Sequence, residues 1–381
     1  MSTKAAPPTG AAAGFGVYVH VPFCAKRCDY CAFATFTDRH HLHDRYLAAV
    51  SRDVAQRVTE GMAPATSIFV GGGTPSMVEP AALCRVLAGI PTVPGAEVTV
   101  ECNPDDLTAD LLSAWIDGGV NRVSLGVQST VPRVLASLGR THDPASVGRA
   151  VELLHASSLA SFNLDVIYGA AGETLDEWRT TLADVAAYDP PHVSAYALTI
   201  EPGTPLADQP DRHPDDDDQA DKYLEIDATM SARGLANYEI SNWARPGHEC
   251  RHNLLYWRQG NYDGFGCAAH SHRSGRRWWN VRTPDRYIEL VEAGQSPESS
   301  HEVLDDETRA IEALQLSIRT RDGVPVEALP PTERADLDGL VAECDGRLLL
   351  TESGRLMTNA VSLRLQAPQS GHRAGSAVPL A

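Results

Sequence analysis

Short β-rich runs alternate with amphipathic helical stretches between residues 15 and 200. Six runs are predicted as strands: 16–21, 67–71, 97–101, 122–128, 162–169 and 192–200. Helices are predicted between them, among others at 42–59, 80–90 and 107–117. Strand followed by helix, repeated, requires right-handed crossovers and produces a parallel sheet. Six units are fewer than the eight of a closed (β/α)8 barrel.

The side-chain alternation of these strands predicts a cavity. Every second residue on one face is polar in five strands, and the members of this face are Tyr18, His20, Thr99, Glu101, Ser124, Gln128, Asn163, Asp165, Ser194 and Tyr196. The other face carries Val, Leu, Phe and Ala. A closed barrel is filled by branched aliphatic side chains, so a shared polar face predicts an open, incomplete (β/α)6 barrel around a ligand cavity.

The stretch HVPFCAKRCDYCAF, residues 20–33, contains Cys24, Cys28 and Cys31 in a C-x3-C-x2-C spacing. A structural zinc ion needs four ligands, and His20 could serve as the fourth. An iron-sulfur cluster held by three thiolates instead leaves one iron with an exchangeable position. Because the loop follows the first strand, either centre is expected at the carboxyl edge of the sheet, where barrel enzymes place their chemistry.

A glycine-rich turn and two carboxylates are predicted beside the cysteines. FVGGGTPSM, residues 69–77, ends the second strand, and its glycines leave N–H groups free to hold a carboxylate or phosphate. Glu101 and Asp165 face the same cavity and suit a cationic ligand with hydroxyl groups. Gln128 and Arg140 extend this rim.

Charge and hydropathy limit the partners. A formal net charge of -18 over 381 residues argues against nucleic-acid binding, which needs excess Lys and Arg. No apolar run approaches the ~18 residues of a membrane span, and MSTKAAPPTGAAAGFG lacks the apolar core of a signal peptide. We therefore expect a cytoplasmic protein without a transmembrane segment.

The pattern changes after residue 200. An acidic stretch at 208–221 predicts a solvated turn before a helix near 219–233, and residues 234–300 show no regular period. Helices followed by a strand pair are predicted near the end of the chain. The predicted organisation is a disordered start at 1–14, a partial barrel at 15–233, a linking segment at 234–300, a helical, winged-helix-like cap at 301–370 and a disordered tail at 371–381.

The cysteine spacing, with an aromatic residue before the last cysteine, resembles the radical S-adenosylmethionine (SAM) superfamily. This resemblance implies an open six-unit barrel in which Cys24, Cys28 and Cys31 hold a [4Fe-4S] cluster and SAM binds the fourth iron. The turn is similar to the superfamily motif that holds the methionine end of SAM, without its glutamate, and the matching residues are Gly72, Gly73 and Thr74.

Five segments resemble, in order and over nearly all of residues 15–370, the oxygen-independent coproporphyrinogen III oxidase family: RVSLGVQS, LGRTHD, NLDVIYGAAGET, SAYALTIEPGTPL and YEISNWARPGHECRHNLLYW. The implied SAM contacts are Tyr18, Gly73, Thr74, Glu101, Gln128, Arg140 and Asp165, and Tyr30 matches the aromatic beside the cluster. Ala32 and Phe33 follow the third cysteine where the oxidase has a further Cys two positions on. Only about 15 residues precede the first strand, fewer than in the oxidase.

HNLLYW, residues 252–257, resembles the H-N-x-x-Y-W motif of the haem-chaperone branch of this family. The resemblance implies haem contacts from His252, Asn253, Tyr256 and Trp257, since an imidazole can ligate haem iron and aromatic rings can lie against a porphyrin. Nearby alternatives for the iron ligand, which the sequence does not rank, are Cys250, His248, His270 and His272.

These resemblances predict a haem chaperone with a [4Fe-4S] cluster and SAM that organise or dimerise the protein, and they assign no catalytic residue. Its partners are expected to be haem and acceptor haemoproteins, including membrane respiratory components. The alternative is a radical SAM oxidase that removes propionate carboxylates of coproporphyrinogen as CO2 in porphyrin biosynthesis.

Overall fold

A computed structural model describes residues 14–367, and the chain divides into two compact units, Met1–Leu304 and Asp305–Ala381. The ends predicted to be disordered, 1–14 and 371–381, lie outside the described part except for residue 14. Within residues 14–367, no helix combines the length and the apolar character needed to cross a membrane.

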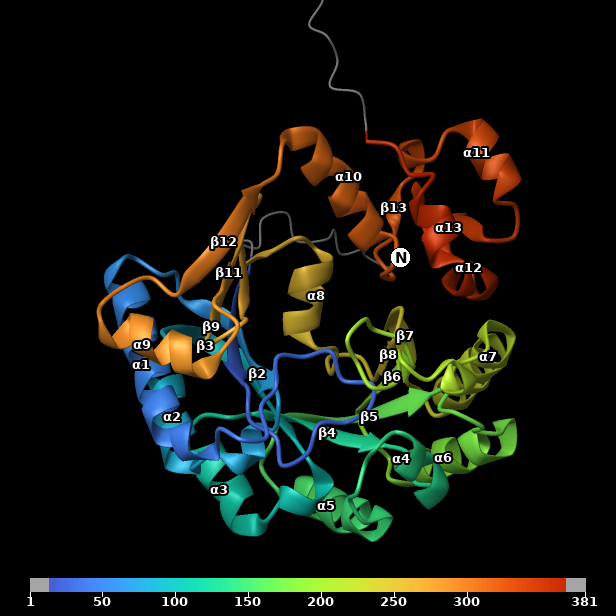
Figure 1. The fold of residues 1–381 in the computed structure, drawn as a ribbon. Helices are drawn as coiled ribbons and strands as arrows, with labels where there is room; N and C mark the ends of the chain where they lie inside the picture. The colour runs from blue at the N-terminus through green and yellow to red at the C-terminus, as the bar shows by residue number, and fades with distance from the viewer. Residues whose placement is uncertain (1–13, 368–381) are drawn as a thin grey trace, which may run out of the picture. The chain divides into compact units, whose positions relative to one another are not determined.

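Six parallel strands form the centre of the first unit (Figure 1). They are β1 (Phe15–Val21), β2 (Ala65–Gly72), β3 (Thr92–Cys102), β4 (Arg122–Gln128), β5 (Ser161–Tyr168) and β6 (His192–Ala197). The helices around them are α1 (His43–Thr59), α2 (Pro80–Ala88), α3 (Ala109–Asp117), α4 (Pro132–Ser137), α5 (Pro144–Ala156), α6 (Leu175–Ala187) and α7 (Asp216–Ala232). Short 3-10 turns are η1 (His40–Leu42), η2 (Pro75–Met77), η3 (Pro104–Asp106) and η4 (Pro210–Arg212). The predicted incomplete (β/α)6 barrel is confirmed.

The crossover helices begin at local signals in the sequence. The Thr108 and Asp143 side chains accept hydrogen bonds from the first turns of α3 and α5. α6 begins with a reciprocal pair in which Thr174 accepts from the Glu177 backbone and the Glu177 carboxylate accepts from the Thr174 N–H. Such caps satisfy N–H groups that a helix leaves without an internal partner.

Residues 234–300, expected to link two domains, contribute to the same sheet as the barrel. Their elements, together with the strand that ends the unit, are β7 (Ala236–Glu239), β8 (Asn242–Ala244), α8 (Arg251–Trp257), β9 (Asn261–Phe265), β10 (His270–Arg273), β11 (Arg276–Asn280), α9 (Pro284–Glu292) and β12 (Glu298–Val303). The sheet order is β12-β11-β10-β9-β1-β2-β3-β4-β5-β6-β8-β7, and β9 pairs in parallel with β1. Most of these strands are short, and β12 is largely exposed. Their sequences therefore lack the alternation of apolar and polar residues that predicts a strand.

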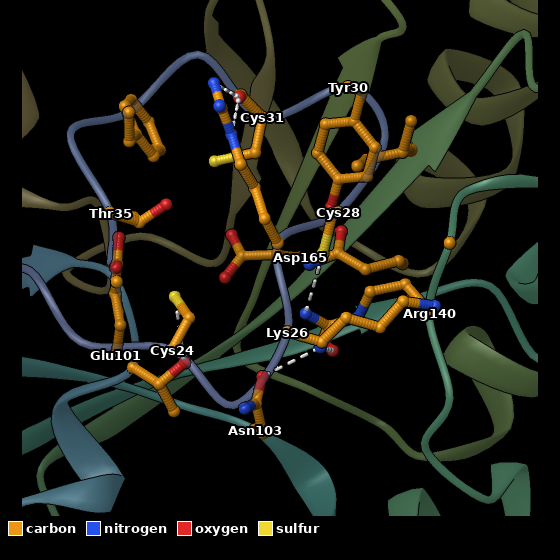
Figure 2. A pocket seen from close by; sticks show the side chains of 18 of the residues that line it. Cys24, Lys26, Cys28, Tyr30, Cys31, Thr35, Glu101, Asn103, Arg140 and Asp165 are labelled. Carbon is orange, nitrogen blue, oxygen red and sulfur yellow. Dashed lines mark hydrogen bonds between the residues drawn. The ribbon is translucent and has the colours of Figure 1, made fainter. Parts of the chain in front are cut away.

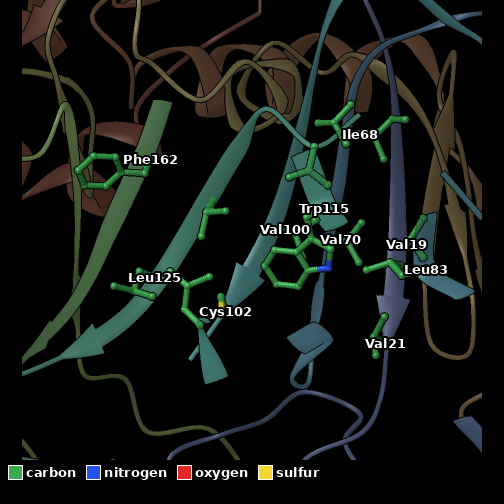
Figure 3. Close-up of a cluster of buried hydrophobic side chains, with 14 of the residues drawn as sticks. Val19, Val21, Ile68, Val70, Leu83, Val100, Cys102, Trp115, Leu125 and Phe162 are labelled. Atoms are coloured by element: carbon green, nitrogen blue, oxygen red, sulfur yellow. The ribbon is translucent and has the colours of Figure 1, made fainter. Parts of the chain in front are cut away.

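The core lies between the outer face of the sheet and its helices (Figure 3). Strand side chains in it include Val19, Val21, Ile68, Val70, Val100 and Leu125. Leu83 of α2 and Trp115 of α3 pack against them and are fully buried. Because side chains alternate along a strand, burying this face turns the polar residues toward the inside of the open barrel.

The second unit has its own small core and sheet. Its elements are α10 (Asp306–Ser317), β13 (Val324–Pro325), η5 (Val326–Ala328), α11 (Pro331–Asp336), β14 (Val341–Cys344), β15 (Arg347–Leu350), α12 (Glu352–Leu356) and α13 (Thr358–Ser362). The antiparallel order is β13-β15-β14. Buried Ile318, Leu337, Leu348 and Val361 hold these elements together. The helices and strand pair match the predicted winged-helix-like arrangement, with β13 as an added strand.

Two valines of the first unit give a matched test of this core. Val100 is 0% exposed and Val303 is 72% exposed. We expect Val100→Ala to lower the free energy of unfolding by about 2 kcal/mol, because it removes buried methyl groups and leaves a cavity. Val303→Ala should stay within about 0.5 kcal/mol of the parent protein. Urea denaturation checks both, and equal losses for the two variants would contradict the assigned core.

Candidate cofactor site

The carboxyl ends of the parallel strands surround a cavity of about 670 Å³ (Figure 2). Of the residues predicted for the cluster and SAM, those that line it are Cys24, Cys28, Tyr30, Cys31, Gly72, Gly73, Thr74, Glu101, Gln128, Arg140 and Asp165. Parallel strands bring residues distant in sequence to one edge of the sheet, which explains this convergence. Tyr18 is not among the lining residues, and its hydroxyl lies 3.0 Å from His20 Nδ1.

The cysteine loop between β1 and α1 is closed at its base by backbone hydrogen bonds. Cys24 N–H donates to the Phe36 carbonyl (3.1 Å), and Phe36 N–H donates to the Pro22 carbonyl (2.7 Å). At the tip, the Arg27 guanidinium donates to the Cys31 carbonyl at 3.0 and 3.2 Å. These hydrogen bonds hold the loop so that its cysteines line the cavity.

Polar neighbours reach the sulfur atoms, and Thr35 is the side-chain partner of Cys31. Thr74 Oγ1 donates to Cys24 Sγ at 3.6 Å, and Arg140 Nη1 donates to Cys28 Sγ at 3.8 Å. Burial nevertheless raises the pKa of Cys24 to about 11 and also raises the pKa of Cys31. Both thiols are thus protonated at neutral pH, and binding iron must displace their protons.

The donor set fits a cluster better than a single ion. No three His, Cys, Asp or Glu side chains within residues 14–367 converge tightly enough to hold one metal ion. His20, the fourth ligand considered for zinc, is engaged elsewhere, since its ring nitrogens lie 3.0 Å from the Tyr18 hydroxyl and 3.0 Å from the Ala34 carbonyl. In an iron-sulfur cluster each thiolate binds its own iron, so more widely spaced sulfur atoms fit this group.

The glycines of the turn serve a different purpose from the predicted one. Gly72 N–H donates to Glu101 Oε2 (3.1 Å), Gly73 N–H to the Val21 carbonyl (2.7 Å) and Thr74 N–H to the Phe23 carbonyl (2.8 Å). The expectation that these N–H groups are free to hold a ligand is therefore wrong, because the protein itself occupies them. Thr74 contributes its hydroxyl instead.

Gly72 and Gly73 are needed because the surrounding protein leaves no room for a side chain at these positions. A Cβ on Gly73 would lie 2.6 Å from the Phe23 carbonyl oxygen, and one on Gly72 would lie 2.3 Å from the His20 ring. Gly72 also has φ of 109°, in the region that favours glycine. The end of β2 can approach the cysteine loop only without side chains.

Two carboxyl groups, those of Glu101 and Asp165, line the cavity. Burial and the nearby Asp165 carboxylate raise the pKa of Glu101 to about 8, although Gly72 N–H donates to it. Burial also raises the pKa of Asp165, although the hydroxyl of Ser124 (2.7 Å) and the amide of Asn163 (2.7 Å) donate to it. An incoming cation would compensate this desolvation and favour both ionised forms.

Arg140 joins three parts of the site. Besides Cys28 Sγ, it donates to Asn103 Oδ1 at 2.8 Å and to the Gly126 carbonyl at 3.3 Å. Gln128, which ends β4, has φ of 62°, and its buried Oε1 has no partner within the described structure. This orphaned oxygen lies in the cavity wall and is available to a ligand.

Sequence reasoning missed several lining residues, notably Asn103, His142 and Tyr196. Asn103 follows β3 by one position, so the rule that strand ends meet at one edge could have found it. His142 lies in the LGRTHD segment already singled out, and burial lowers its pKa to about 4. Tyr196 lies on the predicted polar face of β6 but was not assigned a role.

The predicted haem residues lie on α8, apart from the cysteines. His252 is 1% exposed, and its ring lies against Phe69 of β2 with 5.5 Å between centroids. Ser67 Oγ lies 2.9 Å from His252 Nδ1, and the Tyr256 hydroxyl lies 2.7 Å from Nε2. Burial lowers the pKa of His252 to about 3, so the ring is neutral. Both nitrogens of the motif histidine are thus engaged inside the protein.

The other motif residues are less enclosed. Tyr256 and Trp257 are half-buried, and Tyr256 packs edge-on against Tyr262 with 4.6 Å between centroids. Asn253 lines a second cavity of about 190 Å³. Neither this cavity nor the larger one is lined by all four motif residues.

The alternative iron ligands differ in accessibility. Cys250 is buried beside the Glu97 carboxylate, and His272 Nδ1 lies 2.8 Å from the Gly260 carbonyl. His248 is half-buried, with Nδ1 3.0 Å from Ser161 Oγ. His270 is the exposed member of the group, and its ring stacks on Trp279 with 5.6 Å between centroids.

Comparisons with known proteins identify relatives of this chain. Residues 18–185 match the radical SAM superfamily. The chain is 40% identical over 364 residues to "Heme chaperone HemW" of Mycobacterium tuberculosis, covering 91% of this chain and 93% of that protein. It is 34% identical to the protein of the same name from Escherichia coli, covering 91% and 96%.

A solved structure supports the fold independently. Coproporphyrinogen III oxidase from Escherichia coli aligns with a TM-score of 0.80 at 22% identity, over 92% of this chain and 89% of that chain. At this identity the likeness establishes the shared fold alone. The sequence relatives show that this chain belongs to the HemW family of the radical SAM superfamily.

Proposed function

We propose that this protein is a haem chaperone, which binds haem and passes it to acceptor haemoproteins. The observation that carries the proposal is the similarity to proteins named heme chaperone HemW, at 40% identity over 91% of the chain. The HNLLYW motif and the replacement of the oxidase cysteine by Ala32-Phe33 support it. Acceptors at membranes, a homodimer and a cytoplasmic location belong to the same proposal.

Membership of the superfamily implies a [4Fe-4S] cluster and SAM. Cys24, Cys28 and Cys31 would hold the cluster, which when bound supplies an iron with an open coordination position for SAM. Arg140 would partly neutralise the thiolate charge at Cys28, which it already contacts. Glu101 would face the cationic ligand. We propose that these groups organise the protein and do not drive turnover.

Haem binding by His252 would require a local rearrangement. The neutral ring is the form that ligates iron, but Ser67 and Tyr256 now occupy its two nitrogens. At least one of these contacts must break for a nitrogen to reach haem. His270 needs no such opening, because it is already exposed.

The function is tested with anaerobically reconstituted protein. Haem is titrated by absorbance, and the same sample is incubated with coproporphyrinogen III, SAM and a reductant. We expect a saturable haem spectrum, transfer of haem to an apo-haemoprotein and no decarboxylated product. Decarboxylated product with matching 5'-deoxyadenosine, and no specific haem binding, would favour the oxidase.

Three variants identify the iron ligand. We expect His252→Ala to weaken haem binding by about 10-fold or more, because it removes the imidazole. Ser67→Ala is the matched control, since it breaks the same buried contact while keeping the ring, and it should bind haem at least as well as the parent. If His270→Ala abolishes the haem spectrum and His252→Ala leaves it intact, the ligand is His270.

The raised pKa of Glu101 predicts that SAM binding depends on pH. At pH 6.5 Glu101 is mostly protonated, since its pKa is about 8, and it attracts a cation only after losing this proton. SAM affinity should therefore rise by roughly 20-fold between pH 6.5 and 8.5, with proton release. Calorimetry of cluster-loaded protein in buffers of different ionisation enthalpy measures both.

Glu101→Gln separates this effect from titration of SAM itself. The variant should lose most of the pH dependence attributed to the protein, whereas Glu177→Gln, at a surface ion pair with Arg133, should keep it. An unchanged pH profile in Glu101→Gln would show that the ligand alone titrates.

A further inference from the structure

A second cavity of about 190 Å³ lies on the inner face of the barrel. It shares Glu101, Ser124, Asp165 and Tyr196 with the first cavity, so the two spaces adjoin. Its other lining residues are Phe69, Thr99, Arg122, Asn163, His192, Ser194, Cys250 and Asn253. None of these eight is among the residues predicted for the cluster or SAM, and Asn253 comes from the HNLLYW motif.

Two buried hydrogen-bonding groups in this cavity have no partner within the described structure. Arg122 is 3% exposed, and its Nη1 donates to Ser161 Oγ (3.0 Å) and to the His248 carbonyl (2.9 Å), while Nη2 has no partner. Thr99 is 0% exposed, and its Oγ1 is likewise unpaired. A buried donor without an acceptor is costly, so both groups point to an absent ligand.

The remaining polar wall is internally satisfied. Asn163 Nδ2 donates to Ser124 Oγ (2.8 Å), Asp165 Oδ1 (2.7 Å) and Ser194 Oγ (2.9 Å). His192 bonds through Nδ1 to Asn163 Oδ1, and its Nε2 lies 2.8 Å from the Tyr238 hydroxyl. Arg122 Nη2 and Thr99 Oγ1 are therefore the donors of this wall that have no acceptor within the described structure.

Most titratable groups around the cavity are buried. Burial lowers the pKa of His192 and raises those of Glu101 and Asp165, and it raises the pKa of Cys250 to about 12. His192 and Cys250 are therefore uncharged at neutral pH, and the Arg122 guanidinium is the cation that lines the cavity, together with the carboxyl groups of Glu101 and Asp165.

Glu97 lies behind this wall but is already engaged. Its carboxylate accepts from the backbone N–H groups of His252 (3.1 Å) and Arg251 (3.2 Å) at the start of α8. Cys250 Sγ donates to it at 3.6 Å. It therefore stabilises the helix and does not neutralise Arg122 in the cavity.

We propose that the inner cavity is a carboxylate subsite, in which Arg122, Thr99 and Asn253 hold a propionate arm of a tetrapyrrole. The inference rests on the proposed haem-binding function. It assigns Asn253 to a carboxylate rather than to the porphyrin plane or iron. A free small carboxylate could occupy the same subsite, because it offers the same chemical group. The test below distinguishes a free carboxylate from a propionate arm.

The test compares haem with its dimethyl ester, in which both carboxylates are blocked. The parent protein should bind haem about 10-fold or more tightly than the ester, because a charge-assisted hydrogen bond is lost in the ester. Arg122→Gln should reduce this preference to near unity by weakening haem alone. Thr99→Val, nearly isosteric, should reduce it partly without disturbing the fold. Arg179→Gln, at a surface ion pair with Glu225, should keep the full preference.

The outcomes separate the subsite from the chaperone function. Equal binding of haem and ester by the parent, unchanged in Arg122→Gln and Thr99→Val, would overturn the subsite while haem binding stands. Binding of neither compound would instead contradict the proposed function. Sodium propionate is then tested against sodium chloride by the shift in unfolding temperature. If neither haem nor the ester binds, a propionate-specific shift that Arg122→Gln abolishes would show a subsite for a free carboxylate. It would overturn the haem arm as the occupant.

Discussion

The close approach between the glycine end of β2 and the loop after β1 is the contact on which the site depends. Gly73 and Thr74 donate their N–H groups to the Val21 and Phe23 carbonyls. The loop is thereby attached to the sheet directly before Cys24. Any side chain on Gly72 or Gly73 would push this attachment apart. The position of the cysteines therefore depends on backbone hydrogen bonds between the ends of β1 and β2.

Several buried groups of the site favour their neutral forms before its ligands arrive. Buried thiols and carboxylates have raised pKa values, and the buried imidazoles have lowered ones. The neutral forms lower the cost of burying these particular groups inside the barrel. Ligand binding is then coupled to proton release, since cluster and cation each favour the ionised form of their partners.

Much of the first unit could be predicted from its sequence because its signals are local. The strand and helix periods located β1 to β6, and the alternation on these strands placed Glu101 and Asp165 in the cavity. The sheet extensions escaped prediction, because the pairing of β9 with β1 joins residues more than 240 positions apart. The occupied N–H groups of the glycine turn also depend on a neighbouring strand, which a turn sequence does not contain. The haem motif was found as a string of letters, but only packing against Ser67 and Phe69 reveals how enclosed His252 is.

The parallel pairing of β1 with β9 has a consequence for synthesis of the chain. β2 follows β1 closely, but Phe265 of β9 is made 193 residues after Gly72. At ribosomal rates this gap lasts about 10 to 40 s. During this time the backbone groups on one side of β1 lack their final strand, a state that invites pairing with other chains. The strand that carries the cysteine loop therefore gains its second neighbour only when most of the protein has been translated.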